Sequence, residues 1–185
     1  MLDGGDWRDT PFRVEAVELV GVAREDLADV ETFCEVPLER VLEIAERLAA
    51  AGCAEVAFGD TTGMANPAQV RDFFGAARGA LGGELELTAH FHNTRGQGLA
   101  NVLAALEAGV GSLESSFGEL GGCPVPRGAT GNIATEDLVS MLHEMGIETG
   151  ISLERLIDAA RSAQDVLGRS LGSHVLTAGP VEWKG

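Results

Sequence analysis

The sequence has no tyrosine and a single lysine, Lys184, among its 185 residues. Acidic residues outnumber basic ones by 29 to 13, which gives a formal net charge of −16. Such a chain repels the phosphates of nucleic acids and of anionic lipids, so we expect neither nucleic acid nor a membrane as a partner. The simplest interpretation of the charge is a solvated acidic surface. A small anionic substrate remains open, because a metal ion and a few arginines can reverse the field locally.

Cysteine is also scarce. Cys34, Cys53 and Cys123 are widely spaced and form no Cys-x-x-Cys pair, so neither a disulfide framework nor a metal–cysteine cluster is expected. No signal-peptide pattern and no long apolar run are present, which predicts a protein of the reducing cytoplasm. Hydrophobic residues make up 45% of the chain, which is enough for one domain with a packed core.

Strands and helices alternate from residue 35 onward. Strands are expected over 55–58, 84–89 and 111–117, and their starts are roughly 30 residues apart, the spacing of βα units in a parallel α/β fold. The expected helices run from residue 38 to Gly52, over 67–80, over 98–108, from residue 135, and over 153–167. Asn66, Thr135 and Ser152 are the predicted N-caps of three of them.

Polar residues follow the expected strands: Asp60, then the two histidines His90 and His92, then the glycine-rich loop 118–131. In (β/α)8 barrels, active sites gather at the carboxyl ends of the strands, and a whole barrel needs about 250 residues. The sequence therefore predicts an α/β fold of the (β/α)8 TIM-barrel class, as a partial barrel with about three clear βα units. The expected organisation is a poorly defined segment (1–34), the C-terminal half of a barrel (35–175) and a tail (176–185).

The segment Thr88–Gln97 is the centre of this pattern. Side chains alternate along a strand, so His90 and His92 should point to the same face. Two imidazoles on one face, where a strand ends, suit a single divalent metal ion. For an isolated His-x-His the more common interpretation is a pair of histidines that merely close a strand.

Four pieces share this predicted edge of the sheet. They are Gly59-Asp60-Thr61, His90-Phe-His92-Asn93, Gly121-Gly-Cys-Pro124 and Gly131-Asn132-Ile-Ala-Thr-Glu-Asp137. Together with their spacing, they resemble the 3-hydroxy-3-methylglutaryl-CoA lyase family of metal-dependent barrel lyases over about residues 35–175. The related isopropylmalate and homocitrate synthases share the His-x-His strand but lack the cysteine loop.

The resemblance implies a role for five residues. His90, His92 and Asn132 match metal ligands of the family, and two nitrogens with an amide oxygen suit Mg²⁺ or Mn²⁺ once further oxygens complete the shell. Asp60 and Cys123 match catalytic residues. Taken alone, Asp60 and Asn132 are more typical of turns, and a lone cysteine is more often a small buried hydrophobe.

The implied substrate is an acyl-CoA thioester. The family cleaves 3-hydroxy-3-methylglutaryl-CoA to acetyl-CoA and acetoacetate, a reaction of leucine degradation and ketone body metabolism. A base such as Asp60 would take the hydroxyl proton, and Cys123 would protonate the enolate after the retro-Claisen step.

The sequence departs from the family at its start. The Arg-Asp-Gly motif of the family's first strand has no clear copy, because Arg8-Asp9-Thr10 lacks the glycine. Asn93 also stands where many lyases have aspartate. Three alternatives follow: an inactive half-barrel, a related acyl-CoA lyase or synthase, and a different metal enzyme such as a hydrolase. An open half-barrel would expose strand edges, so we expect a homo-oligomer or a partner chain.

Overall fold

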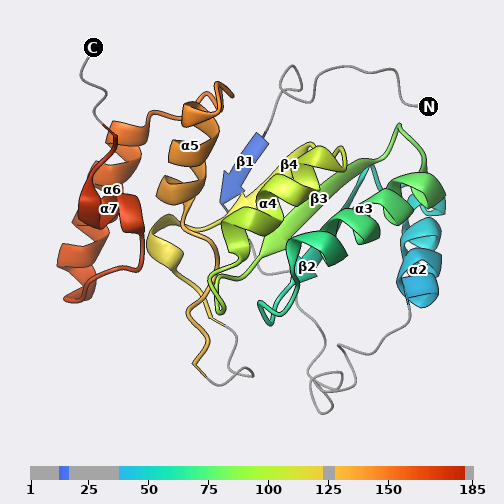
Figure 1. Ribbon diagram of the computed structural model, residues 1–185, viewed down its shortest axis with the longest axis horizontal. Helices are drawn as coiled ribbons and strands as arrows, with labels where there is room; N and C mark the ends of the chain where they lie inside the picture. Colours follow the sequence, from blue (N-terminus) through green and yellow to red (C-terminus); the bar gives the residue numbers. More distant parts are fainter. Residues whose placement is uncertain (1–12, 17–37, 123–127, 182–185) are drawn as a thin grey trace.

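The computed structural model describes residues 13–16, 38–122 and 128–181. A four-stranded sheet lies at its centre, in the order β1-β4-β3-β2, and every neighbouring pair is parallel. The strands are β1 (Arg13–Ala16), β2 (Glu55–Asp60), β3 (Glu86–Phe91) and β4 (Ser112–Ser115). Figure 1 shows the sheet and the helices around it, coloured by their position in the sequence. The predicted parallel α/β fold is confirmed.

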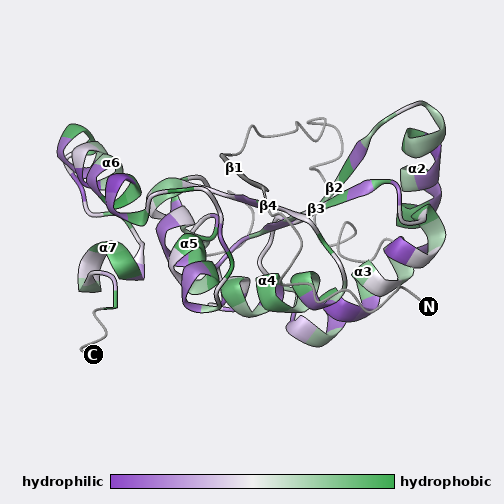
Figure 2. Ribbon diagram, turned by 90° about the horizontal axis from the view of Figure 1, so that it is seen from above, coloured by the Kyte–Doolittle hydropathy of each residue, from purple (hydrophilic) through white to green (hydrophobic). Residues whose placement is uncertain are grey.

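Helices of the βα units cover one face of this sheet. They are α3 (Pro67–Leu81) and α4 (Gly98–Glu107), which pack against each other, while α2 (Leu38–Ala50) packs against α3 and β2. Figure 2 shows α3 and α4 on the same side of the strands, with α4 almost entirely hydrophobic. That composition fits a largely buried helix, because a helix that is hydrophobic on most sides has little polar surface to turn toward water.

The start of α3 forms as predicted. The side chain of Asn66 accepts hydrogen bonds from the backbone amides of Ala68 and Gln69, and the Gln69 side chain accepts one from the Asn66 amide. This reciprocal capping box satisfies backbone donors that the first helical turn cannot pair internally.

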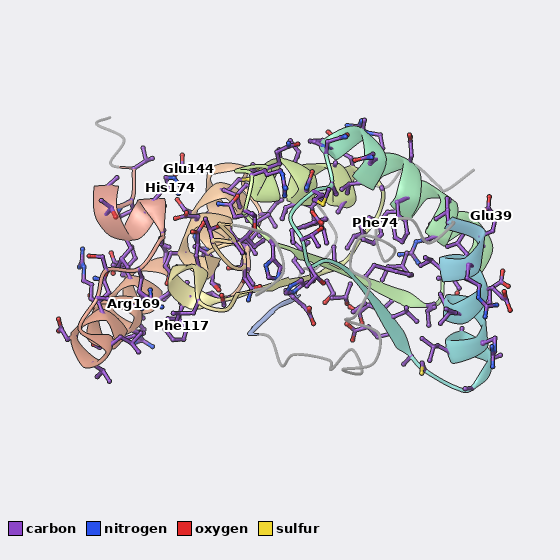
Figure 3. All side chains as sticks on the ribbon, turned by 90° about the horizontal axis from the view of Figure 1, so that it is seen from below. Glu39, Phe74, Phe117, Glu144, Arg169 and His174 are labelled. Carbon is purple, nitrogen blue, oxygen red and sulfur yellow. The ribbon has the colours of Figure 1, made fainter. Side chains whose placement is uncertain are left out.

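The main core lies between the sheet and these helices. Leu87, Ala89 and Phe91 of β3 are buried in it, as are Leu106 of α4 and Leu113 of β4. A cluster of edge-to-face aromatic rings, Phe58, Phe73 and Phe74, joins β2 to α3 at centroid distances of 5.0–5.9 Å. Figure 3 shows Phe74 between α3 and the sheet. Since strand side chains alternate, Thr88 and His90 point to the opposite face of β3.

The remaining helices extend the molecule beyond β4. They are the 3₁₀ turn η3 (Phe117–Glu119), α5 (Thr135–Glu144), α6 (Leu153–Leu167) and α7 (His174–Ala178). A second, smaller core of Ile157, Ala160, Leu171 and Leu176 joins α6 to α7. Figure 1 shows both helices beside α5 at the far end from α2. Ser152 caps α6 as predicted, whereas α7 was not expected from the sequence.

Several predicted boundaries are wrong by a few residues. Thr135 is the first residue of α5 and not its N-cap, which is Ala134; the Thr135 hydroxyl is 2.9 Å from the Ser115 hydroxyl instead. β4 ends at Ser115, because the chain then turns into η3. β3 continues to Phe91, so His90 lies inside the strand. Within the described ranges, no helix is both long enough and apolar enough to cross a bilayer.

Candidate metal-binding and catalytic site

The two histidines lie side by side at the carboxyl end of β3. Their ring centroids are 5.0 Å apart, which confirms that both side chains point to one face. The Nδ1 atoms of both rings are buried and have no hydrogen-bond partner. A Glu114 carboxylate oxygen lies 3.1 Å from Nδ1 of His90, but without the alignment of a hydrogen bond. Buried ring nitrogens without partners are unusual and suit a site that binds a ligand.

Asn132 meets the histidines across an isolated bridge. It pairs with His92 in antiparallel fashion, and the neighbouring residues extend this contact. The backbone amide of Asn93 donates to the Gly131 carbonyl at 2.9 Å, and the backbone amide of Ile133 donates to the Phe91 carbonyl at 3.1 Å. The Asn132 side chain is buried, and its nitrogen donates to the Leu120 carbonyl at 3.1 Å and the Ser116 hydroxyl at 3.3 Å. With the nitrogen engaged by the protein, metal coordination would fall to Oδ1.

Asp60, at the end of β2, anchors the turn that follows. Its two carboxylate oxygens accept the backbone amides of Met64 and Ala65, each at 3.0 Å. This is the turn role that an aspartate in Gly-Asp-Thr commonly has. Its negative charge also acts on both imidazoles and opposes the fall in their pKa. Asp60 therefore stabilises the turn through its hydrogen bonds and also places a negative charge near the two histidines.

Burial keeps both histidines in the neutral form. Burial lowers the pKa of His90. Burial together with the neighbouring His90 lowers the pKa of His92 to about 4. Neutral imidazole is the form that coordinates metals, so at neutral pH no proton has to be displaced from these rings.

These residues fit a divalent metal ion in part. Two neutral imidazoles whose buried Nδ1 atoms make no hydrogen bond, together with one amide oxygen, are suitable ligands. In the part of the chain that the structure describes, no three His, Cys, Asp or Glu side chains gather closely enough to hold a metal by themselves. Further oxygen ligands, from substrate, water or protein, are therefore needed to complete the coordination.

An apolar cavity of about 450 Å³ borders the site beneath α3. Aromatic side chains of β2 and α3, including Phe58, Phe73 and Phe74, line it together with Asp60 and Thr62. Gly59 stands between Phe58 and Asp60, and a Cβ at this position would lie 3.5 Å from the His90 ring. Asp60 thus borders both the cavity and the imidazole pair.

Several groups around the site were not found from the sequence. Glu114 lies directly opposite His90 in the β3–β4 register, a pairing that strand alternation could have revealed. Glu119 accepts a hydrogen bond from Asn93, and nothing in the sequence pattern signals that contact. Glu136 is fully buried and accepts the Gly118 amide, although an acidic residue in the first turn of a helix is commonly only a charge that favours the helix N-terminus.

The other predicted site residue, Cys123, lies outside the described residues, as do Arg8-Asp9-Thr10 and Cys34. The structure therefore brings Asp60, His90, His92 and Asn132 together. The chain around Cys123 is described only up to Gly122, which is exposed, and again from Gly128.

Comparison of the sequence with models of known protein families identifies the family of this chain. The family model HMGL-like matches residues 10–162. The chain belongs to the HMGL-like family. Members of this family depend in general on divalent metals, in keeping with the donor set at the end of β3. The recognised resemblance to the lyases is confirmed.

Curated proteins similar to this chain include hydroxymethylglutaryl-CoA lyases. The enzyme of Bacillus subtilis is 42% identical over 142 residues, which cover 77% of this chain and 47% of that protein. The mitochondrial enzyme of Mus musculus is 43% identical over 142 residues, which cover 75% of this chain and 42% of that protein. The chain thus spans about half the length of the curated relatives it matches.

Solved structures confirm the TIM-barrel fold class and the partial coverage. An HMG-CoA lyase from Acinetobacter baumannii, in complex with coenzyme A and 3-methylmalate, superposes with a TM-score of 0.73 at 41% identity. The match covers 81% of this chain and 50% of that one. The carboxyl transferase domain of Rhizobium etli pyruvate carboxylase matches at a TM-score of 0.61 and 23% identity, which concerns the fold alone.

Proposed function

We propose that this chain carries the His-x-His half of a carbon–carbon lyase that cleaves a 3-hydroxyacyl-CoA thioester. The substrate we propose is 3-hydroxy-3-methylglutaryl-CoA, and the products are acetyl-CoA and acetoacetate. The observation that carries the proposal is that two neutral imidazoles with buried Nδ1 atoms lie beside Asn132 at the carboxyl end of a parallel sheet, in a chain of the HMGL-like family.

The proposed metal is Mg²⁺ or Mn²⁺, held by His90, His92 and Oδ1 of Asn132. When bound, such an ion lowers the energy of negative charge that develops on substrate oxygens. The protein's part is to hold these ligands in place: His90 lies in β3, His92 follows it and bridges to Asn132, and Leu120 and Ser116 accept hydrogen bonds from the side-chain nitrogen of Asn132. Ligands whose own orientation is fixed in this way bind metals more tightly.

The proposed catalytic residues are Asp60 and Cys123. Asp60 takes the proton of the C3 hydroxyl, and its carboxylate retains accepting capacity beyond the two amides it already binds. The bond between C2 and C3 then breaks, so C3 becomes the ketone carbon of acetoacetate and the electron pair moves into the thioester enolate. The thiol of Cys123 donates its proton to C2, which completes acetyl-CoA.

The relatives support the choice of substrate. The similar curated proteins are named for cleavage of hydroxymethylglutaryl-CoA, and the Acinetobacter structure holds coenzyme A with a branched hydroxy acid. A cytoplasmic role in leucine degradation and ketone body metabolism goes with this proposal.

A second candidate is a half-barrel that binds metal but cleaves nothing without a second chain. One observation favours it: the described residues offer no acidic group that completes a three-ligand set with the histidines. In that case a partner chain supplies the missing aspartate and arginine.

The deciding experiment is acetoacetate release from 3-hydroxy-3-methylglutaryl-CoA by the full chain, with Mg²⁺ or Mn²⁺. Cys123→Ala and His92→Ala should abolish it, while Cys53→Ala, at an exposed cysteine, should not. Activity that survives in Cys123→Ala would contradict the lyase mechanism. Metal binding without any cleavage, restored by a second chain that contains the family's Arg-Asp-Gly strand, would favour the second candidate.

A further inference from the structure

Asn93 links the end of β3 to the turn η3. Its side-chain nitrogen donates a hydrogen bond of 2.6 Å to a carboxylate oxygen of Glu119. Bonds between an amide and an ionised carboxylate are shorter and stronger than those between neutral groups. The two residues are far apart in sequence, so this bond joins segments that no local structure would hold together.

Asn93 makes two further hydrogen bonds. Its side-chain oxygen accepts the amide of Gly98, at the start of α4, at 3.2 Å. Its backbone amide donates a hydrogen bond to the carbonyl of Gly131 at 2.9 Å. One residue directly after His92 therefore contacts β3's neighbouring helix, the η3 turn and the residue before Asn132.

Glu119 occupies a backbone conformation that few side chains adopt. Its φ is +57°, the single positive φ at a non-glycine among the described residues. A left-handed conformation is unfavourable for a residue with a Cβ, so neighbouring contacts must hold it there. Its other carboxylate oxygen lies close to Gly172, where a Cβ would come within 2.4 Å. The side chain is therefore enclosed between Asn93 and the segment before α7.

The backbone at Glu119 leads directly to Asn132. The next carbonyl, that of Leu120, accepts the Asn132 side-chain nitrogen at 3.1 Å. Gly131 packs against the same segment, because a Cβ there would lie 2.5 Å from the carbonyl oxygens of both Glu119 and Gly121. A shift of Glu119 would thus displace the Leu120 carbonyl, which accepts the Asn132 side-chain nitrogen, and the segment against which Gly131 packs.

We propose that Asn93 and Glu119 form a positioning pair that fixes the amide of Asn132 relative to His92 and so sets the affinity of the site for its divalent metal. The inference rests on the metal site of the proposed function. Neither residue is proposed as a ligand: Asn93 acts through its backbone on Gly131 and through its side chain on Glu119.

The test is Mn²⁺ affinity of the full chain, measured from the electron paramagnetic resonance signal of free Mn²⁺. Asn93→Asp keeps the acceptor for Gly98 but places a carboxylate against that of Glu119. We expect its Kd for Mn²⁺ to rise about tenfold, within the range found when partners of metal ligands are changed. Glu119→Gln keeps an acceptor oxygen for Asn93, so its Kd should stay within about twofold.

The double variant, Asn93→Asp with Glu119→Gln, reverses the direction of the hydrogen bond and restores the parent's net charge. It should regain most of the lost affinity. Gln164→Glu adds one negative charge on α6 while it keeps the acceptor for the Leu171 amide, so it controls for charge alone. Circular dichroism of each variant separates loss of the fold from loss of metal binding. Glu119→Ala removes the hydrogen bond between the pair without adding repulsion, and it should also weaken Mn²⁺ binding.

Three results would overturn the inference: parent-like affinity in Asn93→Asp, no recovery in the double variant, or unchanged affinity in a folded Glu119→Ala. If the parent binds Mn²⁺ and only these comparisons fail, the proposed metal site stands and the positioning pair does not. If the parent itself binds no Mn²⁺, both are wrong.

Discussion

Ser173 donates its side-chain hydroxyl to a carboxylate oxygen of Asp137 at 2.8 Å, and both groups are buried. The same carboxylate accepts the backbone amides of His174 and Val175 at 3.0 and 2.8 Å. One aspartate of α5 therefore anchors the start of α7. This contact ties the last described helix to the helix that follows Asn132.

Asp137→Asn should destabilise the protein. An amide can replace only part of this acceptor set, and hydrogen bonds to a charged group contribute about 1.5–3 kcal/mol each, so we expect the free energy of unfolding to fall by about 1–3 kcal/mol. Urea denaturation measures it. Asp158→Asn, at an exposed site on α6 with a 3.7 Å ion pair, should change little. Equal midpoints for both variants would contradict the anchoring role.

Glu136→Gln should change how stability depends on pH. Burial raises the pKa of Glu136, so the folded chain binds this proton more tightly than the unfolded chain. The free energy of unfolding should therefore fall as the pH rises from the ordinary glutamate range through the raised pKa. Glutamine still offers an oxygen to the Gly118 amide but does not titrate. We expect the variant to lose this decline in urea titrations from pH 4 to pH 8; parallel pH profiles would argue against it.

His92→Ala should weaken Mn²⁺ binding by more than about tenfold, since removal of a ligand costs more than changes to its partners. Isothermal titration calorimetry on the full chain measures the affinity. His143→Ala removes an exposed imidazole of α5 that contacts Thr149, so it is the matched control. Equal affinity in the two alanine variants would mean that the metal binds elsewhere.

Gly131→Ala should disturb the site more than Gly122→Ala. Gly131 has a φ of +111°, and a Cβ there would meet two carbonyl oxygens at 2.5 Å, whereas a Cβ at Gly122 would meet nothing within 4 Å. The strained backbone alone costs about 1–2 kcal/mol. We expect lower stability in urea and weaker Mn²⁺ binding for Gly131→Ala alone. Similar behaviour of the two variants would contradict the close packing around Asn132.

The repeating part of the fold was predictable because it depends on local signals. Asn66 with Pro67 fixed the start of α3, and Ser152 fixed that of α6, since capping involves residues only a few positions apart. The histidine pair followed from strand alternation. Thr135 was misassigned because its hydroxyl has a tertiary partner in Ser115, and a pattern of single residues cannot reveal such a contact.

The surroundings of the site needed the structure. Glu119 contacts Asn93 only because η3 turns back toward β3, and α7 forms because Asp137 supplies its first amides with an acceptor. Both depend on residues far away in sequence. The predicted ligand set and the role of Cys123 stay predictions, since they concern chemistry and, for Cys123, residues outside the described ranges.

The order of the strands has a consequence for how the chain folds. β1 pairs with β4, and partners such as Arg13 and Ser112 are roughly a hundred residues apart. Closing so large a loop is entropically costly, and chains rich in distant contacts fold slowly. β2, β3 and their helices can assemble first from near neighbours, whereas β1 can join only after β4 is in place. During synthesis on the ribosome, β1 therefore leaves the exit tunnel well before β4 and can form these pairs only after β4 has followed.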